Sequence, residues 1–175
     1  NDYFDLVIID GIKINKEQIK SSKIIIIKIF KEINRVLSSN GCLCAGLHNK
    51  YRLNIFGDEK DQIVFSNSFN GYKSLLNSIG FQVKSYWVLP SHRKPHHSGE
   101  IDNAVCLKWF FQNFDKTFSV DRKFKIIGIF LKIFNSTARK LLVKLFFPSF
   151  LFYCYKEDAP QILEDMLIEK TGFNN

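Results

Sequence analysis

The chain opens with a continuous apolar run that closes in an acid and a glycine. Residues 3–11 read YFDLVIIDG, and runs of this kind are typical of parallel strands covered on both faces. We therefore predict a buried parallel strand here. Such a strand needs neighbouring strands, and nothing before it in this sequence supplies them. We expect the chain to be the back part of an α/β domain whose front lies upstream.

A helical pattern follows, and then a second apolar run. Apolar residues cover one broad side of 21–37, while lysines, Glu32 and Arg35 take much of the rest. Residues 38–41 are expected to end this helix, with Asn40 or Gly41 in the left-handed closing position. Residues 42–47 are the second predicted strand. The pattern as a whole predicts a strand–helix–strand crossover between parallel strands.

The middle of the chain is less regular. Residues 48–69 show little periodicity, which is typical of a lid or binding loop. Asn70 is the predicted cap of a short helix that reaches Ile79 and closes at Gly80. Residues 81–89 are predicted as a third strand and 104–111 as a fourth. Because only a loop is expected between them, the two can pair antiparallel.

The last third of the chain is strongly amphipathic from about 121 to 147. Its polar residues form one narrow stripe, made by Lys125, Lys132, Ser136, Arg139 and Lys140. The apolar arc is too wide for solvent, so either the protein body or a membrane surface must cover it. We favour the protein body, because residues 150–155 read as a strand that returns to the domain. Residues 160–170 read as a short acidic helix.

Composition narrows the function classes. Hydrophobic residues make up 46% of the 175 residues, which is enough for a real core. The net charge of +8 fits lysines used as ordinary surface residues, and a basic face for phosphates or anionic lipid is the alternative. No motif for binding nucleic acid is visible. No uncharged run reaches the ~20 residues that a membrane-spanning helix needs.

The four cysteines carry no zinc-site spacing. We expect them to be small core residues of a protein in a reducing compartment, the cytoplasm, and we expect no metal site. They are Cys42, Cys44, Cys106 and Cys154.

Three segments, in this order, resemble the C-terminal half of a class I S-adenosylmethionine-dependent methyltransferase. Residues 4–11 (FDLVIIDG) look like the family's fourth strand, and residues 32–41 (EINRVLSSNG) look like its E-x-x-R-V-L-K-P-G-G turn from helix to strand. Residues 75–81 (LLNSIGF) look like its L-L-x-x-A-G-F entry to the sixth strand. Ser-Asn replaces the usual Pro-Gly before Gly41. Residues 49–57 and 86–95 resemble a subset associated with bacterial surface polysaccharide genes.

The resemblance implies a fold and a domain organisation. The fold would be α/β: a Rossmann-like methyltransferase sheet, truncated at its N-terminal half, with an antiparallel last strand. That sheet would occupy residues 1–112, and 113–175 would form an amphipathic helical extension with one short strand.

The resemblance also implies an activity. The cofactor would be S-adenosylmethionine, and most of its site would lie in the missing N-terminal half of the same domain. The acceptor would be a sugar-containing or other small molecule. The fragment alone is expected to be inactive.

Position matches to the family assign the candidate cofactor residues. Ligands of open parallel sheets sit beyond the carboxyl ends of the strands, which brings Asp10, Gly11 and Ile12 to the mouth of a site. By the resemblance, they would line the junction between methyl donor and acceptor. The alternative is structural: Asp10 caps the following turn and Gly11 ends the strand.

Candidates for the acceptor side come from two loops. His48 leaves the second strand where a general base would sit, or is a loop histidine bonded to backbone. Asn49 and Arg52 lie beside it, and Arg52 could hold a phosphate or carboxylate. His92 and Arg93 would form a basic lip over an anionic substrate. A metal site built from the histidines of that loop is disfavoured, since few other ligands lie near.

Two other function classes stay open. A non-catalytic α/β module that binds a partner or a membrane surface would explain the wide apolar arc of 121–147. A nicotinamide-dependent oxidoreductase would share the parallel sheet, but the expected antiparallel pair argues against it.

Overall fold

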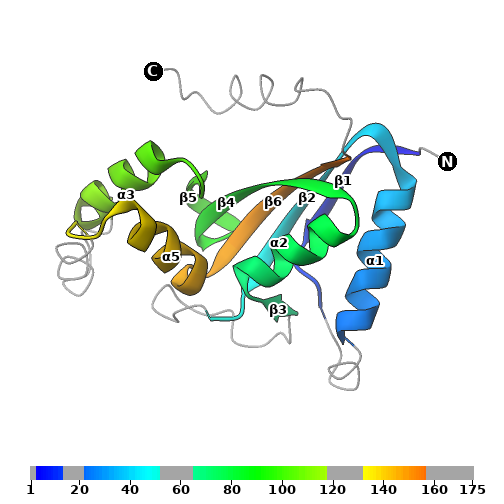
Figure 1. Ribbon diagram of the computed structural model, residues 1–175, viewed down its shortest axis with the longest axis horizontal. Coiled ribbons are helices and arrows are strands. Elements are labelled where there is room, and N and C mark those ends of the chain that lie inside the picture. The colour runs from blue at the N-terminus through cyan, green and yellow to red at the C-terminus, as the bar shows by residue number, and fades with distance from the viewer. Residues whose placement is uncertain (1–2, 14–21, 52–64, 118–131, 157–175) are drawn as a thin grey trace.

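The computed structural model describes residues 3–13, 22–51, 65–117 and 132–156. They form an α/β structure with one mixed six-stranded sheet and helices packed against it (Figure 1). The elements are β1 (Phe4–Asp10), α1 (Ser22–Val36), β2 (Leu37–Asn49), β3 (Ser66–Asn67), α2 (Phe69–Ser78), β4 (Phe81–Ser91), β5 (Lys94–Glu100), α3 (Ala104–Thr117), α5 (Ser136–Phe146) and β6 (Ser149–Lys156).

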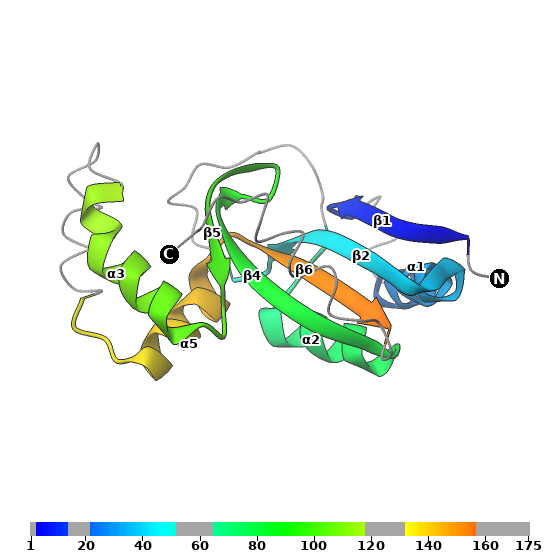
Figure 2. The same cartoon turned by 90° about the horizontal axis from the view of Figure 1, so that it is seen from above.

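The strand order is β1-β2-β6-β4-β5, with the short β3 beside β2. Strands β1 and β2 are parallel, so the predicted strand–helix–strand unit is confirmed. Strand β6 runs antiparallel to both β2 and β4, its two neighbours. The strand predicted at 150–155 is therefore confirmed, and it lies inside the sheet (Figure 2). The boundary expected at residue 112 stays a prediction, although β6 lies beyond it in the chain and pairs with strands that lie before it.

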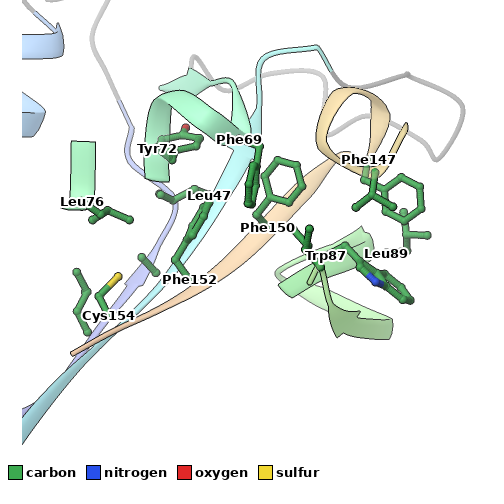
Figure 3. Close-up of a cluster of buried hydrophobic side chains, with 14 of the residues drawn as sticks. Leu47, Phe69, Tyr72, Leu76, Trp87, Leu89, Phe147, Phe150, Phe152 and Cys154 are labelled. Atoms are coloured by element: carbon green, nitrogen blue, oxygen red, sulfur yellow. The ribbon is translucent and has the colours of Figure 1, made fainter. Parts of the chain in front are cut away.

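One face of the sheet, which we call the covered face, carries the core. Alternate residues of β2 and β6 point into it, and Leu43, Leu47, Phe150 and Phe152 are fully buried there. All four described helices add side chains to the same cluster. From α2, the Phe69 ring packs 5.1 Å from that of Phe150 and 5.8 Å from that of Phe152 (Figure 3). This packing gives the sheet its hydrophobic support.

The other face, which we call the open face, carries no helix within the described residues. By strand register it presents two rows of side chains, Leu6–Cys42–Tyr155–Gln82 and Ile8–Cys44–Tyr153–Lys84. A third row contains Asp10, Gly46, Leu151 and Tyr86. The first strand was predicted to be buried, and this is wrong: Leu6 is 55% exposed and Ile8 68% exposed. Strand β1 lies at the edge of the sheet, and the described helices cover only one face of that sheet.

The segment 104–111 was predicted as a strand, and it is the start of helix α3. Its apolar residues Leu107, Phe110, Phe111 and Phe114 follow a spacing of three and four, and all are buried. That spacing places them on one side of a helix. The β-branched and aromatic residues of the segment suggested a strand, but the period of the core contacts decides for a helix. Asn103 caps it by accepting a hydrogen bond from the Cys106 amide at 3.0 Å.

The segment 91–100, expected as a loop, contains strand β5. The pair Ser91↔Lys94 closes a tight antiparallel hairpin with β4, and only His92 and Arg93 lie in its turn. Strand β4 was expected to pair antiparallel with residues 104–111. It pairs antiparallel with β5 instead. Strand β5 lies at the outer edge of the sheet. Its sequence, KPHHSGE, shows no alternation of apolar and polar residues, so it carries no strand signal.

Two helix ends differ from expectation and one agrees. Helix α2 is capped by Ser68, whose hydroxyl accepts a hydrogen bond from the Gly71 amide at 3.1 Å, and not by Asn70. Gly80 has a φ of 95°, as its predicted closing role requires. Gly41 is not left-handed, because β2 begins at Leu37, directly after α1.

Part of the amphipathic stretch lies in α5, whose Val143 is fully buried in the core. Arg139, predicted on an exposed stripe, is also buried, and its guanidinium lies 6.0 Å from the centre of the Phe111 ring. Within the described residues, α5 packs on protein. Residues 118–131 and the predicted helix 160–170 lie outside the described residues. None of the described helices is long and apolar enough to cross a bilayer.

Candidate functional site

The carboxyl ends of β1 and β2 lie side by side, because the two strands are parallel. Asp10 pairs with Gly46, two residues before His48. The Gly11 amide donates to the Gly46 carbonyl at 2.9 Å, and Gly11 adopts a φ of 71° as the chain leaves the sheet. A side chain at Gly11 would strain this conformation. The end of β1 therefore presents an acid beside a glycine turn.

The turn of the β4–β5 hairpin reaches this edge from the far side of the sheet. The Nε2 atom of His92 lies 3.1 Å from the Oδ1 atom of Asp10, and the Nε atom of Arg93 donates to the same oxygen at 3.3 Å. The rings of His48 and His92 meet edge to face, with their centroids 4.6 Å apart. Four side chains from three separate segments of the chain thus form one polar cluster, Asp10–His48–His92–Arg93.

Two small residues hold His92 in place. The His92 amide donates to the hydroxyl of Ser149 on β6 at 2.9 Å. Gly46 leaves room for the ring, since a Cβ at this position would overlap the His92 imidazole. The His92 side chain is consequently only 2% exposed, whereas that of Asp10 is 62% exposed. Asp10 is therefore the exposed member of the pair, and the His92 imidazole is buried beside it.

The cluster combines groups that exchange protons with groups that hold charge. Arg93 is always cationic, while an imidazole changes its charge near neutral pH. Because Asp10 is mostly exposed, its ion pairs contribute modestly to stability. Chemically, this arrangement suits a polar ligand that brings an exchangeable proton or an anionic group to the end of the sheet.

Four of the predicted site residues meet in this cluster: Asp10, His48, His92 and Arg93. Gly11 lies beside it. Ile12 packs against the core, and its carbonyl accepts a hydrogen bond from the Phe65 amide at 2.7 Å.

Asn49, predicted to bind substrate, is 1% exposed, and its side chain has a structural role. Its amide nitrogen donates to the carbonyl oxygens of Lys144, Leu145 and Phe147 at 3.2, 3.0 and 2.9 Å. It ties the end of β2 to the end of α5. Arg52 lies outside the described residues, as does most of the loop that was predicted to form a lid.

Gly46 and Ser149 were missed by sequence reasoning. A glycine within a buried strand is a signal for close approach of another group, so Gly46 could have been found. Ser149 follows a proline and carries no signal of its own, because its role depends on a hairpin turn 57 residues away in the chain.

The remaining reactive side chains in the described part of the chain show no metal-binding group and no low-pKa thiol. No group of three or more His, Cys, Asp or Glu side chains suited to a metal ion exists among the described residues. The four cysteines are free thiols. Burial raises the pKa of the Cys42 thiol to about 11, and it also raises the pKa of Cys44 and Cys154, so they stay protonated and unreactive at neutral pH.

No protein-family model matches this chain, and a search of curated proteins also finds no match.

Proposed function

We propose that this chain is the C-terminal part of a methyltransferase that uses S-adenosylmethionine and acts on a sugar-containing or other small acceptor. The observation that carries the proposal is the cluster of Asp10, His48, His92 and Arg93. These residues were selected from the sequence for a site at the carboxyl ends of the strands, and they come from three separate segments. The order of β1, α1 and β2 and the antiparallel β6 also support it.

The residues at the end of β1 suit a polar cofactor. Gly11 lets a ligand come close to the backbone, and the exposed Asp10 carboxylate can accept hydrogen bonds from it. Bound S-adenosylmethionine would supply an electrophilic methyl group. The rest of its site would lie upstream of this chain.

The histidines supply the proton chemistry that a hydroxyl acceptor needs. His48 would act as the general base that takes the proton of the acceptor hydroxyl. Asp10 orients the neighbouring His92. Arg93 would hold an anionic group of the acceptor.

Calorimetric titration of S-adenosylhomocysteine into the full-length protein tests this proposal. We expect saturable heat of binding, and we expect Asp10→Ala to weaken it by about tenfold, equivalent to ~1.4 kcal/mol. Glu100→Ala, on the outer strand β5, is the matched control and should bind like the wild type. A folded protein that releases no heat would contradict the proposal.

A second candidate is a non-catalytic module that binds a partner protein. The exposed Leu6 and Ile8 on β1 favour it, because contiguous apolar surface marks interaction sites. If S-adenosylhomocysteine fails to bind and β1 variants abolish capture of a partner, this function replaces the first. The nicotinamide-dependent oxidoreductase remains the least favoured class, since β6 is antiparallel within the sheet.

A further inference from the structure

Helix α5 uses only one of its sides in the core. Arg139 and Val143 point inward and are buried. On the opposite side of the helix, Leu141 is 57% exposed. At helical spacing, Ala138 and Leu145 fall in the same row as Leu141, and both are half-buried. The outward side of α5 therefore presents an apolar row that is partly exposed.

Three lysines border this row. Helices α2 and α5 lie side by side on the covered face (Figure 1). Lys140 and Lys144, one turn apart on α5, form a second row next to that of Leu141. The Nζ atom of Lys73, on α2, lies 3.7 Å from one carboxylate oxygen of Asp102, and that of Lys140 lies 3.4 Å from the other. We call Lys73, Lys140 and Lys144 the lysine cluster.

One acid does not balance the charge of the lysine cluster. Burial opposes the ionisation of Asp102, yet the three lysines lower the pKa of its carboxyl below the ordinary value, so it is anionic at neutral pH. Three lysines against one acid leave an excess of two positive charges. Helices α2 and α5 themselves contain no Asp or Glu. The lysine cluster is therefore able to attract an anionic partner.

An apolar row beside a basic cluster fits the surface of an anionic bilayer. The ammonium groups would meet the headgroups, and Leu141 would enter the boundary of the acyl chains. Directly before α5, Ile133 is 78% exposed and Phe134 is 39% exposed, and both add apolar surface at this end of the helix. A nucleic acid would use the lysines only, since its backbone offers phosphate and sugar.

We propose that the outward side of α5 and the lysine cluster form a docking surface for an anionic lipid bilayer. The binding would be peripheral and sensitive to salt, because a few lysines and exposed side chains carry it. This proposal is independent of the methyltransferase function. Asp10 lies in a row of the open face, so a bilayer docked on α5 would leave the Asp10–His48–His92–Arg93 cluster on the other side of the sheet.

Co-sedimentation of the full-length protein with vesicles tests the docking surface. Vesicles of equal amounts of phosphatidylcholine and phosphatidylglycerol should bind the protein, more strongly at low than at physiological salt, and vesicles of phosphatidylcholine alone should not. Each lysine near an anionic surface contributes roughly fivefold to binding, so Lys140→Gln with Lys144→Gln should weaken it roughly 20-fold. No binding to the anionic vesicles would overturn the proposal.

A matched control removes the same charge elsewhere. Lys28 and Lys31 are exposed on α1, which lies at the opposite end of the covered face from α5 (Figure 1). Lys28→Gln with Lys31→Gln should bind the anionic vesicles nearly as the wild type does. If this pair weakened binding as much as the α5 pair, the net charge of the protein and not the lysine cluster would be responsible, and the proposal would fail.

Two single variants separate the charged contact from the apolar one. Asp102→Asn removes the acid of the cluster and should strengthen binding roughly fivefold, whereas a purely structural role of Asp102 would not strengthen it. Leu141→Ser should weaken binding several-fold at every salt concentration. Both side chains are more than half exposed, so both variants should keep the fold, which circular dichroism verifies. Binding to duplex DNA that Leu141→Ser leaves unchanged, without binding to vesicles, would assign the lysine cluster to nucleic acid instead.

Discussion

The two faces of the sheet share the same strands and have opposite properties. Along β6, Phe150, Phe152 and Cys154 point to the covered face and are fully buried. Leu151, Tyr153 and Tyr155 point to the open face and are only half-buried. The backbone is the same, so the described helices, which all pack on the covered face, make the difference. Stability should therefore depend mainly on the covered face.

The candidate site belongs to the open face. By strand register, Asp10, Gly46, His48 and Ser149 all lie on it, at the end away from Leu6. Among the residues that the structure describes, the covered face carries no comparable polar cluster, because its side chains pack in the core. One side of the sheet thus holds the fold together, and the other carries the polar groups that can bind a ligand.

The largest expected effect separates the two faces directly. Phe152→Ala should lower the free energy of unfolding by about 3–5 kcal/mol, because it leaves a cavity among Phe69, Tyr72 and Phe150. Tyr153→Ala, the adjacent residue on the open face, should cost about 1 kcal/mol. Urea denaturation of the two variants measures both values. Similar losses would refute the distinction between the faces.

Asn49→Ala should have the next largest effect. It removes a buried donor from three carbonyl oxygens at the end of α5, which should cost about 2–3 kcal/mol. His48→Ala is the comparison, since His48 points to the candidate site, and we expect it to cost less. Urea denaturation with far-ultraviolet circular dichroism measures both. If His48→Ala lowered the free energy of unfolding more than Asn49→Ala does, His48 and not Asn49 would be the residue that the fold depends on.

Gly46→Ala tests how His92 is positioned. The added methyl group overlaps the imidazole and should destabilise the protein by about 1–2 kcal/mol. In the double variant with His92→Ala the overlap with the ring is gone and only the contact with the Cβ of residue 92, at 3.1 Å, remains, so the added cost of Gly46→Ala should be much smaller. The double-mutant cycle is measured by chemical denaturation. Additive losses would show that Gly46 is needed for another reason.

The smallest effect concerns alkaline pH. Burial raises the pKa of the Cys42 thiol from 9.0 to about 11, so between these values the folded protein holds a proton that the unfolded chain releases. Its stabilising contribution is present below pH 9 and is lost as the pH rises through 11. Cys42→Ala should therefore lose less stability than the wild type between pH 9 and 11 in thermal unfolding. If stability changed with pH in the same way in the wild type and in Cys42→Ala, the Cys42 thiol would be exposed to water in the folded protein.

Much of the fold could be predicted where local pattern and packing agree. The strands at Phe4, Phe81 and Ser149 and the helices α1 and α2 were all predicted from periodicity and end signals. Helix α3 was missed because Val105, Cys106 and Trp109 favour a strand locally, and only the core contacts reveal the helical spacing. Burial of β1 was overestimated, since a single sequence does not show which helices lie on which face.

The candidate site was predicted only in part, because some of its contacts depend on tertiary structure that the local sequence does not indicate. Asp10 and His48 end apolar strands, and that position alone marks them. The contact of His92 and Arg93 with Asp10 depends on the β4–β5 hairpin, which the sequence of β5 does not indicate. Asn49 follows His48 on β2, so its side chain points away from the candidate site, and it bonds to the end of α5, which the sequence does not place there.

The position of β6 has a consequence for synthesis on the ribosome. Strands β2 and β4 have no direct contact in the sheet, because β6 separates them. Strands β1 and β2 can pair as soon as they emerge, but β4 and β5 can join them only after residues 149–156 have been translated. Such long-range pairing makes folding slow. Until then the nascent chain holds two unfinished half-sheets, which are the species that chaperones would have to protect.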